Sequence, residues 1–146
     1  MPLPPIAGTW VKDHAASDSM EEIMEVMRMN GVLKTAIRLL RGLEIKLDEQ
    51  NFSFAVFSVV RWFKIAERYT MDGSVSMSRR RDLRGKMRGN VRLTPHGTLL
   101  VCYEWDDPIA GRGEDEFVIS DGRLLVIATN WVGGREVKYT QVYVRK

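Results

Sequence analysis

The spacing of hydrophobic residues changes once along the chain, near Leu43. Before that point apolar residues recur at three- and four-residue intervals, the spacing of one helical face. Two such stripes follow one another, first Met20, Ile23, Met24 and Met27, then Val32, Leu33, Ala36, Ile37 and Leu40. Ser19 and Glu22 have the spacing of a capping box, and Asn30-Gly31 leaves room only for a tight turn between the stripes. The pattern predicts a helix-turn-helix hairpin within residues 18–41.

From Leu43 to the C-terminus apolar and polar residues alternate, which is the period of half-buried strands. Turn signals such as Asp121-Gly122 and Gly133-Gly134 divide this region. We expect strands near residues 43–48, 52–59, 61–69, 73–79, 86–94, 98–105, 112–119, 123–131 and 136–144, with a further strand around Trp10. Short antiparallel strands in such a meander must close or stack to protect their edges. The sequence therefore predicts a mostly β fold, a ten-stranded antiparallel up-and-down β-barrel with a helical lid between its first two strands.

Composition narrows the class of protein. The chain has 146 residues, 45% of them hydrophobic and 28% charged, which is typical of one soluble domain spanning residues 1–146. Its prolines make residues 1–7 an extended lead-in. No apolar run approaches the roughly 18 residues of a membrane span, and the N-terminus lacks the pattern of a signal peptide. Cys102 is the only cysteine, and His14 and His96 lie far apart. We therefore expect a cytoplasmic monomer with no disulfide, metal or cofactor.

Alternate residues of a barrel strand face the interior, and the apolar ones identify that set. Eight residues are expected to line a cavity and bind a ligand there: Phe54, Val56, Phe63, Ile65, Tyr103, Phe117, Gln141 and Tyr143. An apolar space with a few polar groups is the usual makeup of a small-molecule site. The alternative is a barrel packed solid, in which the same residues fill the core.

Several short segments, taken together, resemble a known family. They are Gly8-Thr9-Trp10, the Ser17 to Met24 stretch, Trp105-Asp106, the Asp121-Gly122 hairpin and the terminal Thr140-Gln141-Val142-Tyr143. In this order they are similar to the intracellular lipid-binding proteins, the fatty-acid-binding and cellular retinoid-binding proteins of the calycin superfamily, over nearly the whole chain. The resemblance implies an intracellular carrier without enzymatic activity. It would bind a fatty acid, retinoid or similar lipid non-covalently inside the barrel.

The head-group position departs from the fatty-acid-binding pattern. In the family an Arg-x-Tyr on the last strand binds a carboxylate, whereas this chain has Gln141-Val142-Tyr143, as in the retinol-binding members. The partner position falls on Phe117, or on Glu116 if a loop differs by one residue, and neither is a cation. Because an unpaired buried carboxylate is costly, a neutral head group is favoured. A carboxylate held by Arg61 or Arg123, or near Arg38 at the portal, is the competing possibility.

The lid is expected to have an apolar and a basic side. Val32, Leu33, Ile37 and Phe57 are the predicted portal into the cavity. Lys34, Arg38 and Arg41 recur at i, i+4 and i+7 and are the predicted contact with anionic membranes, unless they form a merely solvated face.

A basic segment from Arg79 to Arg88 supports a different class of function. It contains Arg79, Arg80, Arg81, Arg84, Lys86 and Arg88, which suit a nucleic-acid or acidic-partner binding module. The plainer interpretation is a solvated loop, and because no nucleic-acid motif accompanies it we expect no nucleic acid as partner. Catalysis has less support: neither histidine has a serine or cysteine at motif spacing, and at most two residues of Glu114-Asp115-Glu116 can face one cavity. A calycin-fold enzyme is the least favoured alternative.

Overall fold

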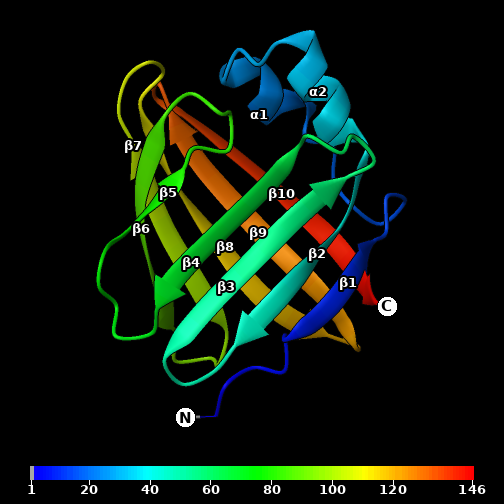
Figure 1. The fold of residues 1–146 in the computed structure, drawn as a ribbon, viewed down its shortest axis with the longest axis vertical. Coiled ribbons are helices and arrows are strands. Elements are labelled where there is room, and N and C mark those ends of the chain that lie inside the picture. The colour runs from blue at the N-terminus through cyan, green and yellow to red at the C-terminus, as the bar shows by residue number, and fades with distance from the viewer. Residues whose placement is uncertain (1) are drawn as a thin grey trace.

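The β-strands of this protein form a single antiparallel sheet that curls into a barrel, as a computed structural model describing residues 2–146 shows (Figure 1). The strands are β1 (Gly8–Lys12), β2 (Leu40–Leu47), β3 (Asn51–Ser58), β4 (Lys64–Thr70), β5 (Ser76–Arg79), β6 (Lys86–Leu93), β7 (Leu99–Trp105), β8 (Gly111–Ser120), β9 (Arg123–Val132) and β10 (Arg135–Arg145). Each pairs with its neighbour in sequence except β4 with β5, and β1 pairs with β10. The predicted ten-stranded up-and-down barrel is confirmed.

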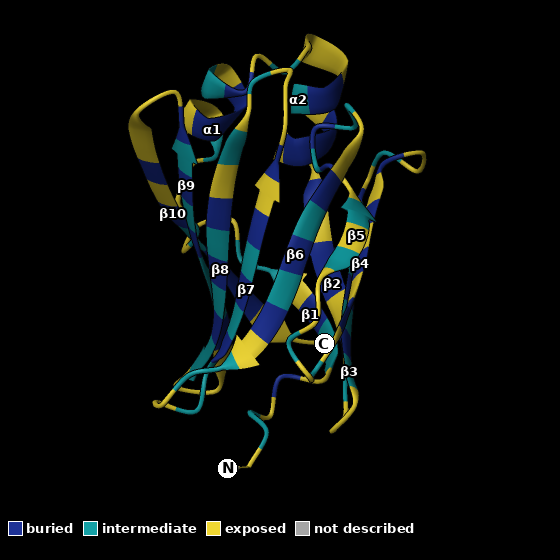
Figure 2. Ribbon diagram, turned by 90° about the vertical axis from the view of Figure 1, so that its left-hand side faces the viewer, coloured by how far each residue is buried: buried dark blue, intermediate teal, exposed yellow. Residues whose placement is uncertain are grey.

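Burial alternates along the strands, as the period of 2 predicts (Figure 2). On β7 the side chains of Leu99, Val101, Tyr103 and Trp105 are buried. The strands β4 and β5 begin three residues later than expected. The preceding turns are wide and carry their own hydrogen bonds, such as Phe63 N–H to the Val60 carbonyl and Ser74 N–H to the Asp72 carboxylate. Strand register is therefore set by the inward residues, whereas strand ends depend on turn chemistry.

The lid has two helices that are shorter than the predicted range 18–41. They are α1 (Glu21–Val26) and α2 (Gly31–Arg38), and both lie across one end of the barrel (Figure 1). The capping-box prediction was wrong, because Met20 occupies the N-cap without a side-chain bond and the Ser19 hydroxyl accepts only from the Glu21 N–H, at 3.1 Å. Asn30 does cap α2, accepting from the Leu33 N–H at 2.8 Å.

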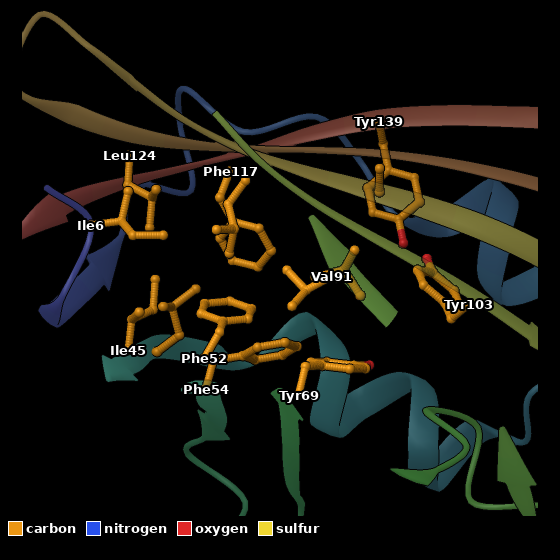
Figure 3. Packing of buried hydrophobic residues seen from close by; sticks show 14 of the residues in the cluster. Ile6, Ile45, Phe52, Phe54, Tyr69, Val91, Tyr103, Phe117, Leu124 and Tyr139 are labelled. Carbon is orange, nitrogen blue, oxygen red and sulfur yellow. The ribbon is translucent and has the colours of Figure 1, made fainter. Parts of the chain in front are cut away.

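The end of the barrel opposite the lid is filled. Ile6 of the lead-in is fully buried, and its carbonyl accepts a hydrogen bond from the Trp10 indole at 2.8 Å. Above them Phe52, Phe54 and Phe117 form an aromatic cluster with ring centroids 5.2–5.7 Å apart (Figure 3). This packing closes the end of the barrel opposite the helices.

Candidate functional site

A cavity of about 150 Å³ lies inside the barrel beneath the helices. All eight residues predicted to line a cavity do so: Phe54, Val56, Phe63, Ile65, Tyr103, Phe117, Gln141 and Tyr143. That they bind a ligand stays a prediction. The helices contribute Ile23, Met27 and Ile37 to the wall, so the lid covers this space directly.

The cavity is smaller than the roughly 300–1,000 Å³ of most ligand pockets. Four of its lining side chains are methionines: Met20, Met27, Met29 and Met87. Methionine is unbranched and repacks readily around irregular shapes. Flexible side chains therefore surround much of the space under the lid, opposite the aromatic floor.

A charged cluster occupies the middle of the barrel. Arg81 reaches inward from the loop between β5 and β6, and its Nε and Nη2 donate to the Glu67 carboxylate at 2.8 and 3.0 Å. Its Nη1 donates to Asp115 at 2.6 Å. The Glu67 side chain is fully buried, that of Asp115 is 5% exposed and that of Arg81 is 25% exposed. Two acids from β4 and β8 thus share one guanidinium.

Two tyrosines complete the hydrogen bonding of the acids. The Tyr69 hydroxyl donates to Glu67 at 2.6 Å, and the Tyr103 hydroxyl donates to Asp115 at 2.9 Å. The Arg81 guanidinium carbon lies 4.3 Å from the centroid of the Tyr103 ring. Gly113 makes room for that ring, since a Cβ there would come within 2.5–2.6 Å of Tyr103 atoms. Each carboxylate is consequently satisfied without water.

The loop that carries Arg81 is fixed at both ends. Arg80 and Asp82 form a buried two-point ion pair, with nitrogen–oxygen distances of 3.0 and 2.7 Å, and Arg80 also donates to the carbonyls of Asp106 and Pro108. Arg84 donates to the carbonyls of Met27 and Arg28, just after α1. The position of Arg81 is therefore coupled to the lid.

Burial shifts the proton affinities of the cluster. It raises the pKa of Asp115 above its usual value, although Arg81 opposes the shift. Burial lowers the pKa of Arg81, but the attraction of Asp115 and Glu67 for its positive charge is larger. The pKa of Arg81 is therefore held well above its ordinary value. Desolvation also raises the pKa of Tyr139 to about 12. The hydroxyls of Tyr139 and Tyr103 point toward one another in Figure 3. With both acids ionised, the Arg81 cluster carries one net negative charge.

Two buried polar atoms that line the cavity have no hydrogen-bond partner within residues 2–146. They are Nδ2 of Asn130 and Oε1 of Gln141. Gln141 donates through Nε2 to the Asp18 carbonyl at 3.0 Å, ahead of α1. This bond fixes the amide with its nitrogen toward the backbone, which leaves Oε1 as the free acceptor. An unpaired buried acceptor is costly, which makes Gln141 Oε1 a position where a hydrogen-bond donor would be stabilising.

The residues predicted for the portal differ in position. Phe57 pairs with exposed Lys64 on the outer side of β3 and β4 and does not line the cavity, and its place in a portal stays a prediction. Val32 is 66% exposed on α2, whereas Leu33 and Ile37 are buried beneath that helix. Arg41 lies on β2 because the chain becomes extended at Leu40.

The predicted basic helical stripe is also incomplete. Arg38 forms a two-point ion pair with Glu21 of α1, which offsets its charge. Lys34 and Arg41 have no such ion pair among the described residues.

The basic segment from Arg79 to Arg88 is not a solvated loop. Arg80 is 3% exposed, and Arg80, Arg81, Arg84 and Arg88 all bond to partners within the chain. Of its six basic residues, Arg79 and Lys86 are exposed. The segment therefore offers no free patch of six cations, and the alternative of a nucleic-acid or acidic-partner module loses the feature that motivated it.

Sequence reasoning missed the charged cluster, although part of its signal was present. Glu67 lies between the inward residues Ile65 and Tyr69, and Asp115 lies two residues before the inward Phe117. Alternation alone places both carboxylates inside. Of the run Glu114-Asp115-Glu116, only Asp115 faces the cavity.

Comparisons with known proteins identify the fold. No protein-family model and no curated protein sequence matches the chain. Among solved structures, lipid binding protein 8 of Caenorhabditis elegans superposes with a TM-score of 0.79 at 18% identity, over 100% of both chains. The brain fatty acid-binding protein of Drosophila melanogaster gives 0.70 at 18% identity, over 93% of this chain and 95% of that one. The zebrafish ileal bile acid-binding protein complexed with cholic acid gives 0.69 at 15% identity, over 96% and 98%.

The chain thus has the fold of the intracellular lipid-binding proteins, a calycin-like barrel with a helical lid. Within residues 2–146 neither helix has the length and apolar character needed to cross a bilayer.

Proposed function

We propose that this protein is a cytoplasmic carrier that encloses a hydrophobic ligand in its barrel, without covalent chemistry. The observation that carries the proposal is the lidded cavity, whose walls are mainly apolar and whose one fixed, unpaired acceptor is Gln141 Oε1. Proteins that share the fold are named for lipids, fatty acids and bile acids, which supports the ligand class.

The ligand carries an uncharged head group that donates a hydrogen bond to Gln141. Gln141 and Tyr143 are two residues apart on β10, so both side chains face the cavity. A hydroxyl that donates to Oε1 satisfies the unpaired acceptor at a net gain of about 1 kcal/mol. A retinol-like or long-chain alcohol fits this description, and Phe54 and Phe117 provide an apolar floor for its hydrocarbon part.

Ligand transfer takes place at anionic membranes through the lid end of the molecule. Lys34 lies on α2 and Arg41 at the start of β2, and the turn between β3 and β4 carries exposed Arg61 and Trp62, the latter 55% exposed. The Val59 N–H donates to the Leu39 carbonyl at 3.0 Å, which joins this turn to the end of α2. Tryptophan beside basic residues suits the membrane interface, where each cation contributes about 1 kcal/mol.

A substitution that fills the cavity tests the carrier function. Ala128 is 2% exposed and faces the cavity, whereas Ala66 on β4 faces solvent. We expect Ala128→Phe to abolish binding of dodecanol, measured by displacement of the neutral dye Nile red, and the matched control Ala66→Phe to bind like the parent. Equal binding by all three proteins would place the ligand outside the barrel and reject the proposal.

A further inference from the structure

With Glu67 and Asp115 ionised, the buried side chains of the barrel carry more negative than positive charge. Arg80 and Asp82 neutralise one another in the loop, which leaves Arg81 opposite both Glu67 and Asp115. Neither acid is exposed by more than 5% of its side chain. Solvent screening is weak for such buried charges. An anionic ligand that enters the cavity is therefore repelled by the excess negative charge.

Arg81 has little capacity left to receive an anion. A guanidinium has five N–H donors. Nε and Nη2 each donate to Glu67, while Nη1 donates to Asp115 and to the Tyr103 hydroxyl at 3.2 Å. Arg80 and Arg81, the two arginines that line the cavity, are therefore both occupied by the protein's own carboxylates.

We propose that Glu67 and Asp115 determine head-group selectivity by excluding anionic lipids from the cavity. This inference rests on the carrier function proposed above and names the residues that set its ligand class. It follows that Arg81 is a latent anion receptor, and that removing both acids converts the protein from an alcohol binder into a binder of anionic amphiphiles.

Dodecanol and dodecyl sulfonate form a matched pair of probes with the same chain and different head groups. The sulfonate stays anionic at every pH used, so protonation of the ligand does not affect the comparison. Affinities are measured by Nile red displacement for the parent, for Glu67→Gln/Asp115→Asn, and for the same double variant with Arg81→Met. The control is Glu114→Gln, which removes one negative charge from the outer face of β8 beside Asp115.

The parent and Glu114→Gln should prefer the alcohol by about tenfold or more, since like charge at close range costs several kcal/mol. The double variant should bind the sulfonate at least about tenfold more tightly than the parent. Adding Arg81→Met should abolish the gain. Asp115→Asn alone preserves the two-point pair of Arg81 with Glu67 and should give a smaller gain in sulfonate affinity over the parent. This single variant provides the test if the double variant does not fold.

The outcomes separate the two proposals. If the parent binds neither probe, the carrier function fails. If the parent binds the sulfonate as tightly as the alcohol, or if neither Asp115→Asn nor the double variant improves sulfonate binding, the acids do not set selectivity and the carrier function stands.

Discussion

Replacing Arg81 by methionine should destabilise the protein strongly, because two buried carboxylates then lose the one cation that pairs with them within residues 2–146. Arg81 makes three charged bonds of 2.6–3.0 Å to Glu67 and Asp115. Removing one partner of a buried ion pair costs about 3–5 kcal/mol, and the 25% exposure of Arg81 places the expected loss near the lower end, about 3 kcal/mol. This is a large fraction of the roughly 5–15 kcal/mol of a typical domain.

Urea unfolding followed by circular dichroism measures this loss at pH 7 and pH 5. At pH 5 the loss should shrink, since carboxylates without a cation take up protons in the folded state. The triple variant with Glu67→Gln and Asp115→Asn should recover most of the stability, because its interior holds no unpaired charge. A loss below about 1 kcal/mol, the value of a surface pair, or an equal loss at both pH values would refute the reasoning.

Three further predictions concern single features of the molecule. Folding raises the pKa of Asp115, so the protonated carboxyl contributes stability that is fully present below the ordinary pKa of 3.8 and is lost as pH rises through the folded pKa. As pH rises from 3.8 through the folded pKa, the parent should therefore lose unfolding free energy relative to Asp115→Asn. Urea titrations of both proteins at matched pH measure this difference. Gln141→Leu should weaken dodecanol binding by about 1 kcal/mol. Unchanged affinity in the displacement assay would mean that the head group does not bind at Gln141. Lys34→Glu/Arg41→Glu should leave dodecanol affinity unchanged but slow ligand transfer to phosphatidylserine vesicles at low salt, a difference that neutral vesicles should abolish.

The sequence predicted the barrel because apolar and polar residues alternate along most of its strands. Ile65, Tyr103 and Phe117 were assigned inward by the same rule that places them around the cavity. Glu67 and Asp115 obey that rule too, but their charge favours a solvent-facing interpretation unless a buried cation is known. At these two positions the charge predicts exposure, whereas the alternation along the strand predicts burial. The structure follows the alternation.

The sequence alone does not identify Arg81 as the partner of these acids. Arg81 lies in a loop, where no period indicates a direction, among five other basic residues of similar chemistry. Its inward orientation depends on Arg80 pairing with Asp82 and on Arg84 bonding to the carbonyls after α1. The bonds of Arg84 to the Met27 carbonyl, and of Arg80 to the Asp106 and Pro108 carbonyls, join segments far apart in sequence, so local propensity carries no trace of them.

The end of the lid shows a different limit. Leu40 fits the apolar stripe of a helix and equally the first inward position of a strand. The structure makes it a strand residue, since Leu40 pairs with Ser58 of β3. Tertiary pairing thus overrides a helical pattern that continues to Gly42, and it moves Arg41 off the helix.

Native mass spectrometry of the purified protein, followed by organic extraction and identification of the released molecule, tests the central claim most directly. The account predicts a retained or readily reloaded lipid, bound non-covalently, whose head group is uncharged. A protein that neither retains a lipid nor takes up dodecanol, or one that releases a fatty acid as its main ligand, would contradict it.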